Sequence, residues 1–188
     1  MSTSVGLRPL NRALTTGFSL IEVLVAVAVV AVLLSLAAPS FSSFFARYRV
    51  DTTREEMIAS IQLARVEAIR QAKEVVLARS TANCSPALSG GATDWSCGWV
   101  VFTDLNENGV QDVATEPTIQ TVAQPIGVAI ANNNGSLVTM NRFGQFAGFG
   151  SFTFIPTSIS SGTTTASQII CINAGSRIRT IKGAIACS

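Results

Sequence analysis

The most constraining feature of this sequence is a long apolar run near its N-terminus, residues 18–38, in which Glu22 is the only ionisable residue. About 20 residues of α-helix, at roughly 1.5 Å each, suffice to cross the hydrocarbon core of a bilayer. A carboxylate inside such a helix is costly to bury without a partner, which predicts that Glu22 is functional. The run therefore predicts a membrane-spanning helix that starts close to Gly17.

The segment ahead of this run, residues 1–17, carries Arg8 and Arg12 and no acidic residue. This composition is typical of the basic region of an export signal, and its charges favour the cytoplasm. An ordinary secretory signal would be cleaved after the apolar run, but the sequence around Ala38 is a poor site because Pro39 follows directly. Cleavage ahead of the run would instead keep the apolar helix in the mature protein.

The helix is predicted to continue past Pro39 as an amphipathic segment. Between residues 54 and 72 apolar residues recur at spacings of three and four, whereas the opposite positions are charged. This spacing buries one helix face and leaves the other in water. We therefore predict a helix over residues 18–78, in which 18–45 form the transmembrane or filament-core part and 46–78 pack on a globular head.

Beyond the helix, short runs of strand-forming residues alternate with Gly, Asn and Pro signals. Residues 75–78 suit either a first strand or the end of the helix. Further strands are predicted at 95–103, 118–123, 128–131, 137–141, 150–156, 168–173 and 177–181. The predicted fold class is α+β, with the long N-terminal helix packed on an antiparallel β-sheet head of residues 46–188, of which 79–188 are β-rich.

Three aromatic residues, Trp95, Trp99 and Phe102, fall in or beside the first of these β-rich runs. They could form a binding platform. Aromatic residues in strands usually pack a sheet against its neighbour, so we predict a role in the core.

The cysteine count is even, with Cys84, Cys97, Cys171 and Cys187. If the head is exported, it folds in an oxidising compartment where two disulfides are expected. Three pairings are possible, and Cys84–Cys97 with Cys171–Cys187 is favoured because each pair closes a short loop rich in turn residues. Buried free thiols are the alternative. No C-x-x-C spacing favours a metal site.

Three stretches resemble a known family. Gly17-Phe-Ser-Leu-Ile-Glu22 resembles the prepilin processing site of type IV pilins and type II secretion pseudopilins. Residues 63–70 and the Trp-Ser-Cys-Gly-Trp-Val-Val-Phe-Thr-Asp stretch at 95–104 resemble the GspH/FimT group of minor pilins. The resemblance implies cleavage between Gly17 and Phe18, which removes residues 1–17 as a leader, and N-methylation of Phe18. It also implies that Glu22 pairs with the Phe18 amino group of a neighbouring subunit during assembly.

The resemblance further implies a pilin-like fold and a structural role as a minor pilin of a type IV pilus. Its partners would be a prepilin peptidase, other major and minor pilins and an inner-membrane assembly platform. The chain would cross the inner membrane once with its head in the periplasm, then join an extracellular pilus. The alternative is a minor pseudopilin of a type II secretion system. No cofactor is implied, and the absence of His and of nucleophile-elbow or phosphate-loop motifs argues against an enzyme.

A basic motif lies near the C-terminus. Gly175-Ser-Arg-Ile-Arg179 resembles the Gly-Arg-x-Arg motif of DNA-binding members of the group, although a serine separates the glycine from Arg177. On a strand, Arg177 and Arg179 share a face, and Lys182 and Arg142 could join them. No acidic residue follows Glu116. Such a patch predicts sequence-independent contact with phosphates of double-stranded DNA, as in natural transformation. The alternative is a solvated strand face.

The stretch after residue 103 resembles the start of a calcium loop, with Asp104, Asn106, Asn108 and Asp112 at positions one, three, five and nine. The twelfth position is Thr115, where a bidentate glutamate is needed. Asn-Gly is also a strong hairpin signal. A turn is the favoured interpretation, and a calcium site is the alternative.

Overall fold

The computed structural model describes residues 17–81, 84, 91–146, 148–158, 166–173, 175–183 and 186–187, without the side chains of residues 36–40. The chain divides into two compact units, Met1–Ser40 and Phe41–Ser188. The predicted leader lies outside the described residues except for Gly17. The second unit begins at Phe41, slightly ahead of the boundary at residue 46 that the sequence predicts.

The first unit contains the start of helix α1 (Leu20–Gln71), which continues beyond Pro39 as predicted. Ser19 caps the helix, because its Oγ and its carbonyl oxygen accept the Glu22 backbone N–H at 3.3 and 3.1 Å. Serine at the cap and glutamate three residues later is a favoured pair for starting a helix. No helix formed by the described residues is both long enough and apolar enough to cross a membrane.

Helix α1 ends at Gln71, so the prediction of a helix to residue 78 is wrong. The chain reverses at Ala72, whose φ is 51°. The Ala72 N–H donates to the Ile69 carbonyl and the Lys73 N–H to the Ala68 carbonyl, both at 3.3 Å. This is the hydrogen-bond pattern of a Schellman cap, in which glycine usually takes the left-handed position. Alanine in that position explains why the sequence did not reveal the helix end.

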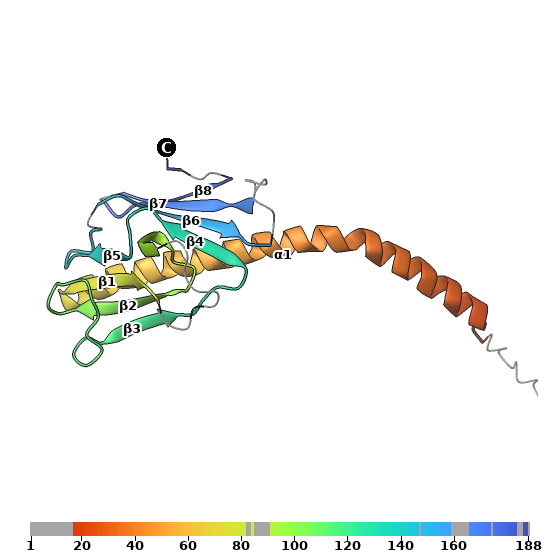
Figure 1. Ribbon diagram of the computed structural model, residues 1–188, viewed down its shortest axis with the longest axis horizontal. Coiled ribbons are helices and arrows are strands. Elements are labelled where there is room, and N and C mark those ends of the chain that lie inside the picture. The colour runs from red at the N-terminus through yellow and green to blue at the C-terminus, as the bar shows by residue number, and fades with distance from the viewer. Residues whose placement is uncertain are drawn as a thin grey trace, which may run out of the picture. The chain divides into compact units, whose positions relative to one another are not determined.

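The second unit holds two antiparallel sheets (Figure 1). Its strands are β1 (Glu74–Arg79), β2 (Trp99–Asp104), β3 (Thr118–Val122), β4 (Val128–Asn132), β5 (Leu137–Met140), β6 (Gly150–Pro156), β7 (Gln168–Ile172) and β8 (Ile178–Lys182). A short 3-10 helix, η1 (Gly91–Thr93), precedes β2. One sheet has the order β3-β2-β1-β5 and the other β4-β6-β7-β8. The predicted α+β, pilin-like class is confirmed, and residues 75–78 prove to be strand rather than helix end.

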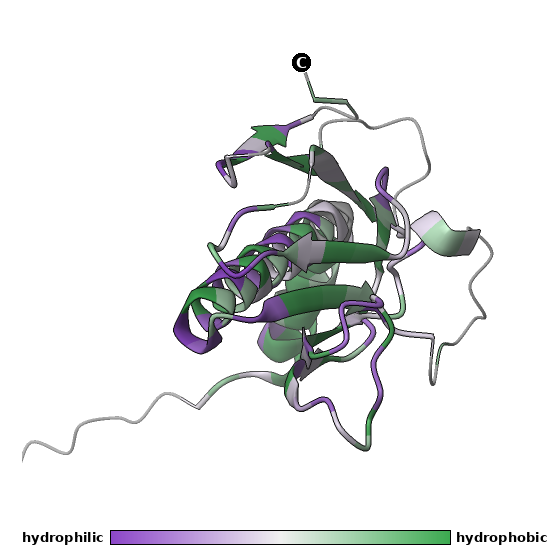
Figure 2. Cartoon of the chain, turned by 90° about the vertical axis from the view of Figure 1, so that its left-hand side faces the viewer, coloured by the Kyte–Doolittle hydropathy of each residue, from purple (hydrophilic) through white to green (hydrophobic). Residues whose placement is uncertain are grey.

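One face of the head part of α1 packs into a core shared by both sheets. Buried helix residues recur at Val50, Met57, Ile61, Ala64 and Ala68, spacings of three, four and seven that place them on one face. Their partners in the same core are Val75, Leu77, Trp95, Trp99, Val101, Ile130, Phe152, Phe154, Ile170 and Ile172. Figure 2 shows the hydrophobic strands grouped around the helix. Trp95, Trp99 and Phe102 are all fully buried, and the predicted packing against the helix is confirmed for the two tryptophans, whereas Phe102 lies outside this core.

Polar contacts fix the position of the helix against each sheet. The Trp99 Nε1–H donates to Ser60 Oγ at 2.9 Å, and both residues are fully buried. The Arg54 Nη1 donates to Gln168 Oε1 at 2.6 Å, and the Gln168 Nε2 donates to Asp51 Oδ1 at 2.8 Å. Leaving one partner of such a buried pair unsatisfied is more costly than the pair is stabilising. These contacts therefore select one register of helix on sheet.

Two disulfides, Cys84–Cys97 and Cys171–Cys187, join the cysteines in the pairs that the sequence favours. The first attaches the loop after β1 to the turn before β2. The second attaches β7 to the C-terminal segment.

Gly98, in the turn before β2, provides a test of the packing between β2 and β3. Its φ is +86°, and a Cβ placed on it would lie 2.2 Å from the Val122 carbonyl oxygen. We expect Gly98→Ala to lower the free energy of unfolding by about 3 kcal/mol, from backbone strain and overpacking together. Urea unfolding followed by the fluorescence of Trp95 and Trp99 measures this, since both tryptophans lie in the core of the head.

The matched control is Gly135→Ala. Gly135 also has a positive φ, +96°, but its added Cβ would meet no atom within 4 Å. We expect Gly135→Ala to lower the free energy of unfolding by about 1 kcal/mol, from backbone strain alone. Equal losses in the two variants would contradict the proposed clash with β3.

Candidate functional site

The outer face of the second sheet brings together residues from β6, β7 and β8 in two adjacent rows. Strand pairing aligns Ser151 with Cys171 and Cys171 with Arg179. The next residues along the chain past the ends of these paired strands are Phe149, Asn173 and Arg177. The Asn173 N–H donates to the Arg177 carbonyl at 3.3 Å. Residues two apart on a strand point to the same face. The two rows therefore form one surface.

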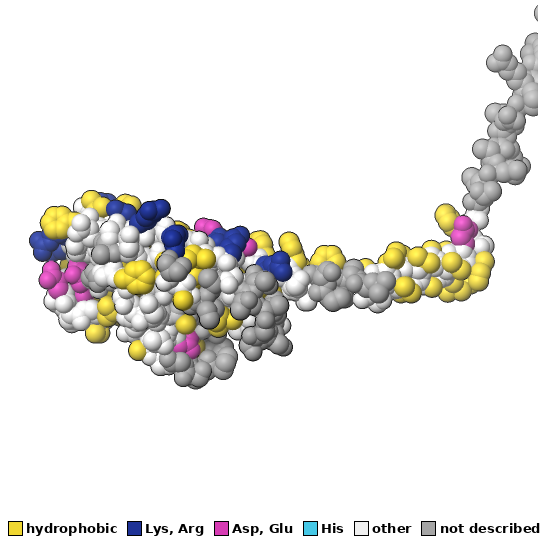
Figure 3. Space-filling view, turned by 90° about the horizontal axis from the view of Figure 1, so that it is seen from above, with side chains coloured by type: hydrophobic (Ala, Val, Ile, Leu, Met, Phe, Trp, Pro, Cys, Tyr) yellow, Lys and Arg dark blue, Asp and Glu magenta, His cyan; other side chains and the backbone are white. Residues whose placement is uncertain are grey.

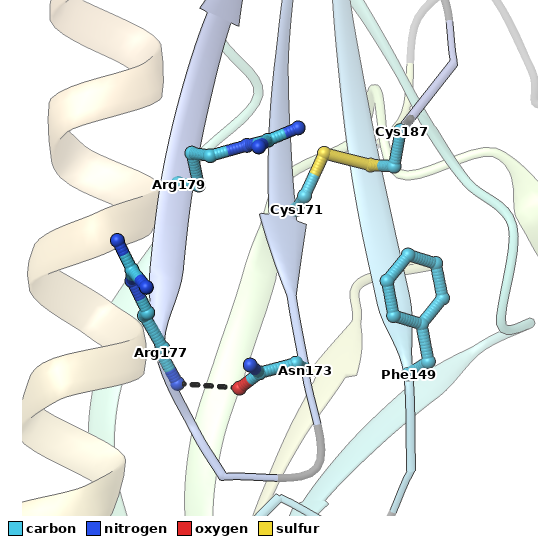
Figure 4. A pocket seen from close by; sticks show the side chains of 6 residues that line it. All are labelled: Phe149, Cys171, Asn173, Arg177, Arg179 and Cys187. Carbon is cyan, nitrogen blue, oxygen red and sulfur yellow. Dashed lines mark hydrogen bonds between the residues drawn. A yellow bond between two sulfur atoms is a disulfide. The ribbon is translucent and has the colours of Figure 1, made fainter.

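A cavity of about 260 Å³ opens on this surface. Its lining residues are Phe149, Cys171, Asn173, Arg177, Arg179 and Cys187. Figure 4 shows the two arginines on one side, the Phe149 ring on the other, Asn173 between them and the Cys171–Cys187 disulfide alongside. The Arg177 N–H donates to Asn173 Oδ1 at 2.9 Å, which fixes the chain at the start of β8.

The structure thus brings together two of the four cations that the sequence singles out, Arg177 and Arg179. Lys182 falls on the alternate side of β8, where its Nζ lies 4.0 Å from Asp51 Oδ1. Arg142 follows β5 and lies 3.8 Å from Glu107 Oε1. Figure 3, seen from the side of β7 and β8, shows Lys and Arg side chains spread over the head with Asp and Glu beside some of them. The cavity is therefore lined by two of the four cationic residues of the predicted patch, Arg177 and Arg179.

Sequence reasoning missed two residues of this surface, Phe149 and Asn173. Phe149 lies between two glycines in a stretch with no charged residue, and Asn173 resembles any residue of a turn. Only the pairing register of β6, β7 and β8 places them beside Arg177.

The N-terminal site is described separately, because it lies in the first unit. Gly17 and Phe18 precede α1, and the Phe18 side chain is exposed. Among the described residues, no atom would lie within 4 Å of a Cβ placed on Gly17. Glu22 lies in the first turn of α1, where a carboxylate interacts favourably with the positive end of the helix dipole.

The loop between β2 and β3 is organised by two buried carboxylates, Asp104 and Glu116. Asp104 Oδ2 accepts the Gly109 N–H at 2.7 Å, and Glu116 Oε1 and Oε2 accept the Leu105 and Asp112 N–H groups, each at 2.9 Å. The side chains of Asn106, Asn108 and Asp112 also accept backbone N–H groups of this loop. The side-chain oxygens that a calcium ion would require thus accept backbone hydrogen bonds within this turn. Within the described residues, no group of three or more His, Cys, Asp or Glu could hold a metal ion.

Comparisons with known proteins agree with this geometry. The prokaryotic N-terminal methylation motif matches residues 13–38, and the family described as type II transport protein GspH matches residues 53–183. No curated protein matches the chain. Among solved structures, the type IV minor pilin FimU of Pseudomonas aeruginosa is similar in two crystal forms. One gives 16% identity and a TM-score of 0.56 over 74% of this chain and 93% of FimU. The other gives 17% and 0.51 over 71% and 93%.

A long N-terminal helix that packs on antiparallel sheets, and whose first part lies within an N-terminal methylation motif, defines a pilin-like protein. Proteins of this class are structural subunits, and the motif indicates one that is anchored in a membrane before it joins a pilus. The GspH match covers well over half of the residues. The chain therefore belongs to the GspH family, with the role of a minor pilin or pseudopilin.

The carboxylates near the β2–β3 loop predict a dependence of stability on pH. Glu74 lies opposite Asp104 in the β1–β2 pair. Desolvation, with repulsion from Asp104 and Glu107, raises the pKa of Glu74 above 4.5. Protonated Glu74 therefore contributes to the stability of the fold below pH 4.5. This contribution is lost as the pH rises through the higher pKa that Glu74 has in the folded state. We expect Glu74→Gln to raise the free energy of unfolding at about pH 7 and to have little effect at about pH 3.5.

Glu67→Gln is the control of opposite sign. Hydrogen bonds from Arg70 and Gln71 lower the pKa of Glu67, so its contribution is present at neutral pH and lost in acid. Urea unfolding at the two pH values compares the variants. A loss of stability for Glu74→Gln at neutral pH would contradict the assigned repulsion.

Proposed function

We propose that this chain is a minor pilin of a type IV pilus. A prepilin peptidase cleaves it between Gly17 and Phe18 and methylates Phe18. The protein then waits in the inner membrane with its head in the periplasm, until an assembly platform moves it into a filament of major and minor pilins. The observation that carries this proposal is the methylation motif that includes the capped start of α1, followed by a folded head of the GspH family.

The exposed apolar side chains of the first unit support assembly. The side chains of Leu20, Ile21, Leu24, Val27, Leu33 and Leu34 are each more than half exposed. Apolar surface on this scale is covered by lipid or by other chains in a working protein. In the assembled filament, the N-terminal helices of neighbouring pilins would cover these apolar side chains.

Glu22 supplies the specific contact in this proposal. It lies in the first helical turn, where its carboxylate is open to a neighbouring chain. Burying either the carboxylate or the Phe18 ammonium alone among apolar helices costs several kcal/mol. A pair between Glu22 and Phe18 of an adjacent subunit removes both costs at once.

A minor pseudopilin of a type II secretion system is the second candidate, and the description of the matched family supports it. Deleting the gene in the native host separates the two. Loss of surface pili with normal secretion of exoproteins supports the pilus, and the reverse outcome supports the secretion system.

We further propose that the head contacts extracellular DNA through Arg177 and Arg179, as a step in natural transformation. Support comes from their place on one cavity, with Arg179 on β8 and Arg177 directly before it, and from the lack of any acidic residue after Glu116. Two guanidinium groups on one face suit phosphate contacts, which bind DNA without reading its sequence.

The first test concerns assembly. We expect Glu22→Gln to reduce the amount of this chain in sheared surface filaments at least tenfold, because the Phe18 ammonium then lacks its partner. Immunoblots of the filament and membrane fractions measure this. Glu56→Gln, at an exposed glutamate in the head part of α1, is the control and should assemble normally. Recovery of Glu22→Gln in filaments at the unchanged level would contradict the proposed pair.

The second test concerns DNA. We expect the purified chain in a non-ionic detergent to shift double-stranded DNA at about 50 mM salt, with affinity that falls as salt rises. Replacing Arg177 and Arg179 by Gln should weaken binding strongly and reduce the slope of log K against log salt by about 1.8, since each phosphate contact contributes about 0.9.

The matched control removes the same charge elsewhere, by replacing Arg142 and Lys182 with Gln. Each of these residues lies beside a carboxylate and neither lines the cavity. Equal losses in both double variants would show that net charge alone matters. No shift for the unchanged chain would refute DNA contact.

A further inference from the structure

We propose that the cavity on β6, β7 and β8 seats one unpaired nucleotide, with its base against Phe149 and its phosphate between Arg177 and Arg179. The inference rests on the proposed DNA contact and names the form of DNA that the site takes. That form is a single strand or an unpaired end, in preference to the interior of a duplex.

The first argument is the arrangement of chemistries across the sheet. Phe149, directly before β6, and Arg177, directly before β8, lie on opposite sides of Asn173, in one row on one face. Neighbouring strands are about 4.8 Å apart, so the aromatic ring and the guanidinium stem from backbones about 10 Å apart. A nucleotide carries a flat apolar base at one end and a phosphate at the other. A nucleotide can therefore place its base against Phe149 and its phosphate beside Arg177 at the same time (Figure 4).

The second argument is the exposure of Phe149. The neighbouring Phe146 is 4% exposed and packs in the core, whereas Phe149 is 52% exposed on the outer face of the sheet. Core packing therefore does not account for it. An exposed aromatic ring beside cationic groups is the usual platform for a base of single-stranded nucleic acid, because stacking accepts every base.

The third argument is the size of the cavity. About 260 Å³ is slightly less than the 300–1,000 Å³ typical of small-molecule sites, so it suits one base with its sugar. The bases of a duplex are stacked and paired inside the helix and cannot reach Phe149 without being flipped out. A duplex therefore contacts the arginines alone, and Phe149 discriminates between the two forms.

The site is also fixed in position before any ligand binds. The Cys171–Cys187 disulfide forms one wall of the cavity, and Arg179 lies opposite Cys171 in the β7–β8 pair. Asn173 Oδ1 accepts the Arg177 backbone N–H, which holds the first arginine beside the cavity. A surface whose parts are already fixed loses less entropy on binding than a mobile one.

The experiment measures fluorescence anisotropy of three labelled DNAs of equal length with the full chain in a non-ionic detergent. The probes are an oligothymidylate, an abasic strand with the same phosphates, and a blunt duplex. We expect the oligothymidylate to bind about tenfold more tightly than the abasic strand. Phe149→Leu should remove this difference and leave duplex binding unchanged. Phe149→Trp should preserve it.

Phe143→Leu is the matched control, because Phe143 is another strongly exposed phenylalanine that does not line the cavity. Replacing Arg177 and Arg179 by Gln should weaken binding of all three DNAs. Duplex binding with no preference for the oligothymidylate, or with no effect of Phe149→Leu on it, would overturn the nucleotide site and leave DNA contact standing. No binding of any probe would overturn both proposals.

Discussion

The burial of one face of α1 against both sheets is the interaction on which the rest of the head depends. Met57 and Ile61 from the helix share a single core with Trp99 from one sheet and Phe152 from the other. Ala64 and Ala68 follow on the same face, and their small side chains let the strands approach the helix closely. The same helix face therefore contributes to a core that both sheets share. Displacing the helix would expose both at once.

Buried polar contacts convert this apolar packing into a specific arrangement. The apolar face alone would tolerate a rotation of the helix or a shift along its axis. The Ser60–Trp99 hydrogen bond and the Arg54–Gln168–Asp51 contacts exclude such shifts, because each would leave a buried polar atom without its partner. Gln168 begins β7, so the second of these contacts also sets the position of the strand that carries Cys171 and leads into Asn173. The cavity thus depends on the core.

The sequence predicted most strands closely, because β-branched and aromatic runs are clearly separated by Gly, Asn and Pro. The helix start near Gly17 was also predicted, from the apolar run, and the burial of the core tryptophans was predicted from their place in a strand-forming stretch. The end of the helix was not, because Ala72 takes a left-handed position that glycine usually signals. Of the candidate site, the sequence predicted the two arginines but not Phe149 and Asn173. Arg179 lies on β8 and Arg177 directly before it, and period-two alternation places them on one face. Phe149 and Asn173 join them through pairing between strands, which no local pattern encodes.

The position of β8 at the edge of its sheet suggests a simpler role for its charges. Cationic residues on edge strands prevent pairing with other chains, and Arg177, Arg179 and Lys182 would all serve that purpose. Edge protection, however, requires only charge on the exposed strand. It does not require an exposed aromatic ring two strands away, a cavity between the ring and the arginines, or a disulfide that fixes one wall. Lys182, which lies beside Asp51 on the alternate side of β8, fits the simpler role. Arg177 and Arg179 share their face with Phe149 and Asn173, and this combination of charge, aromatic surface and an open cavity is what a ligand site needs.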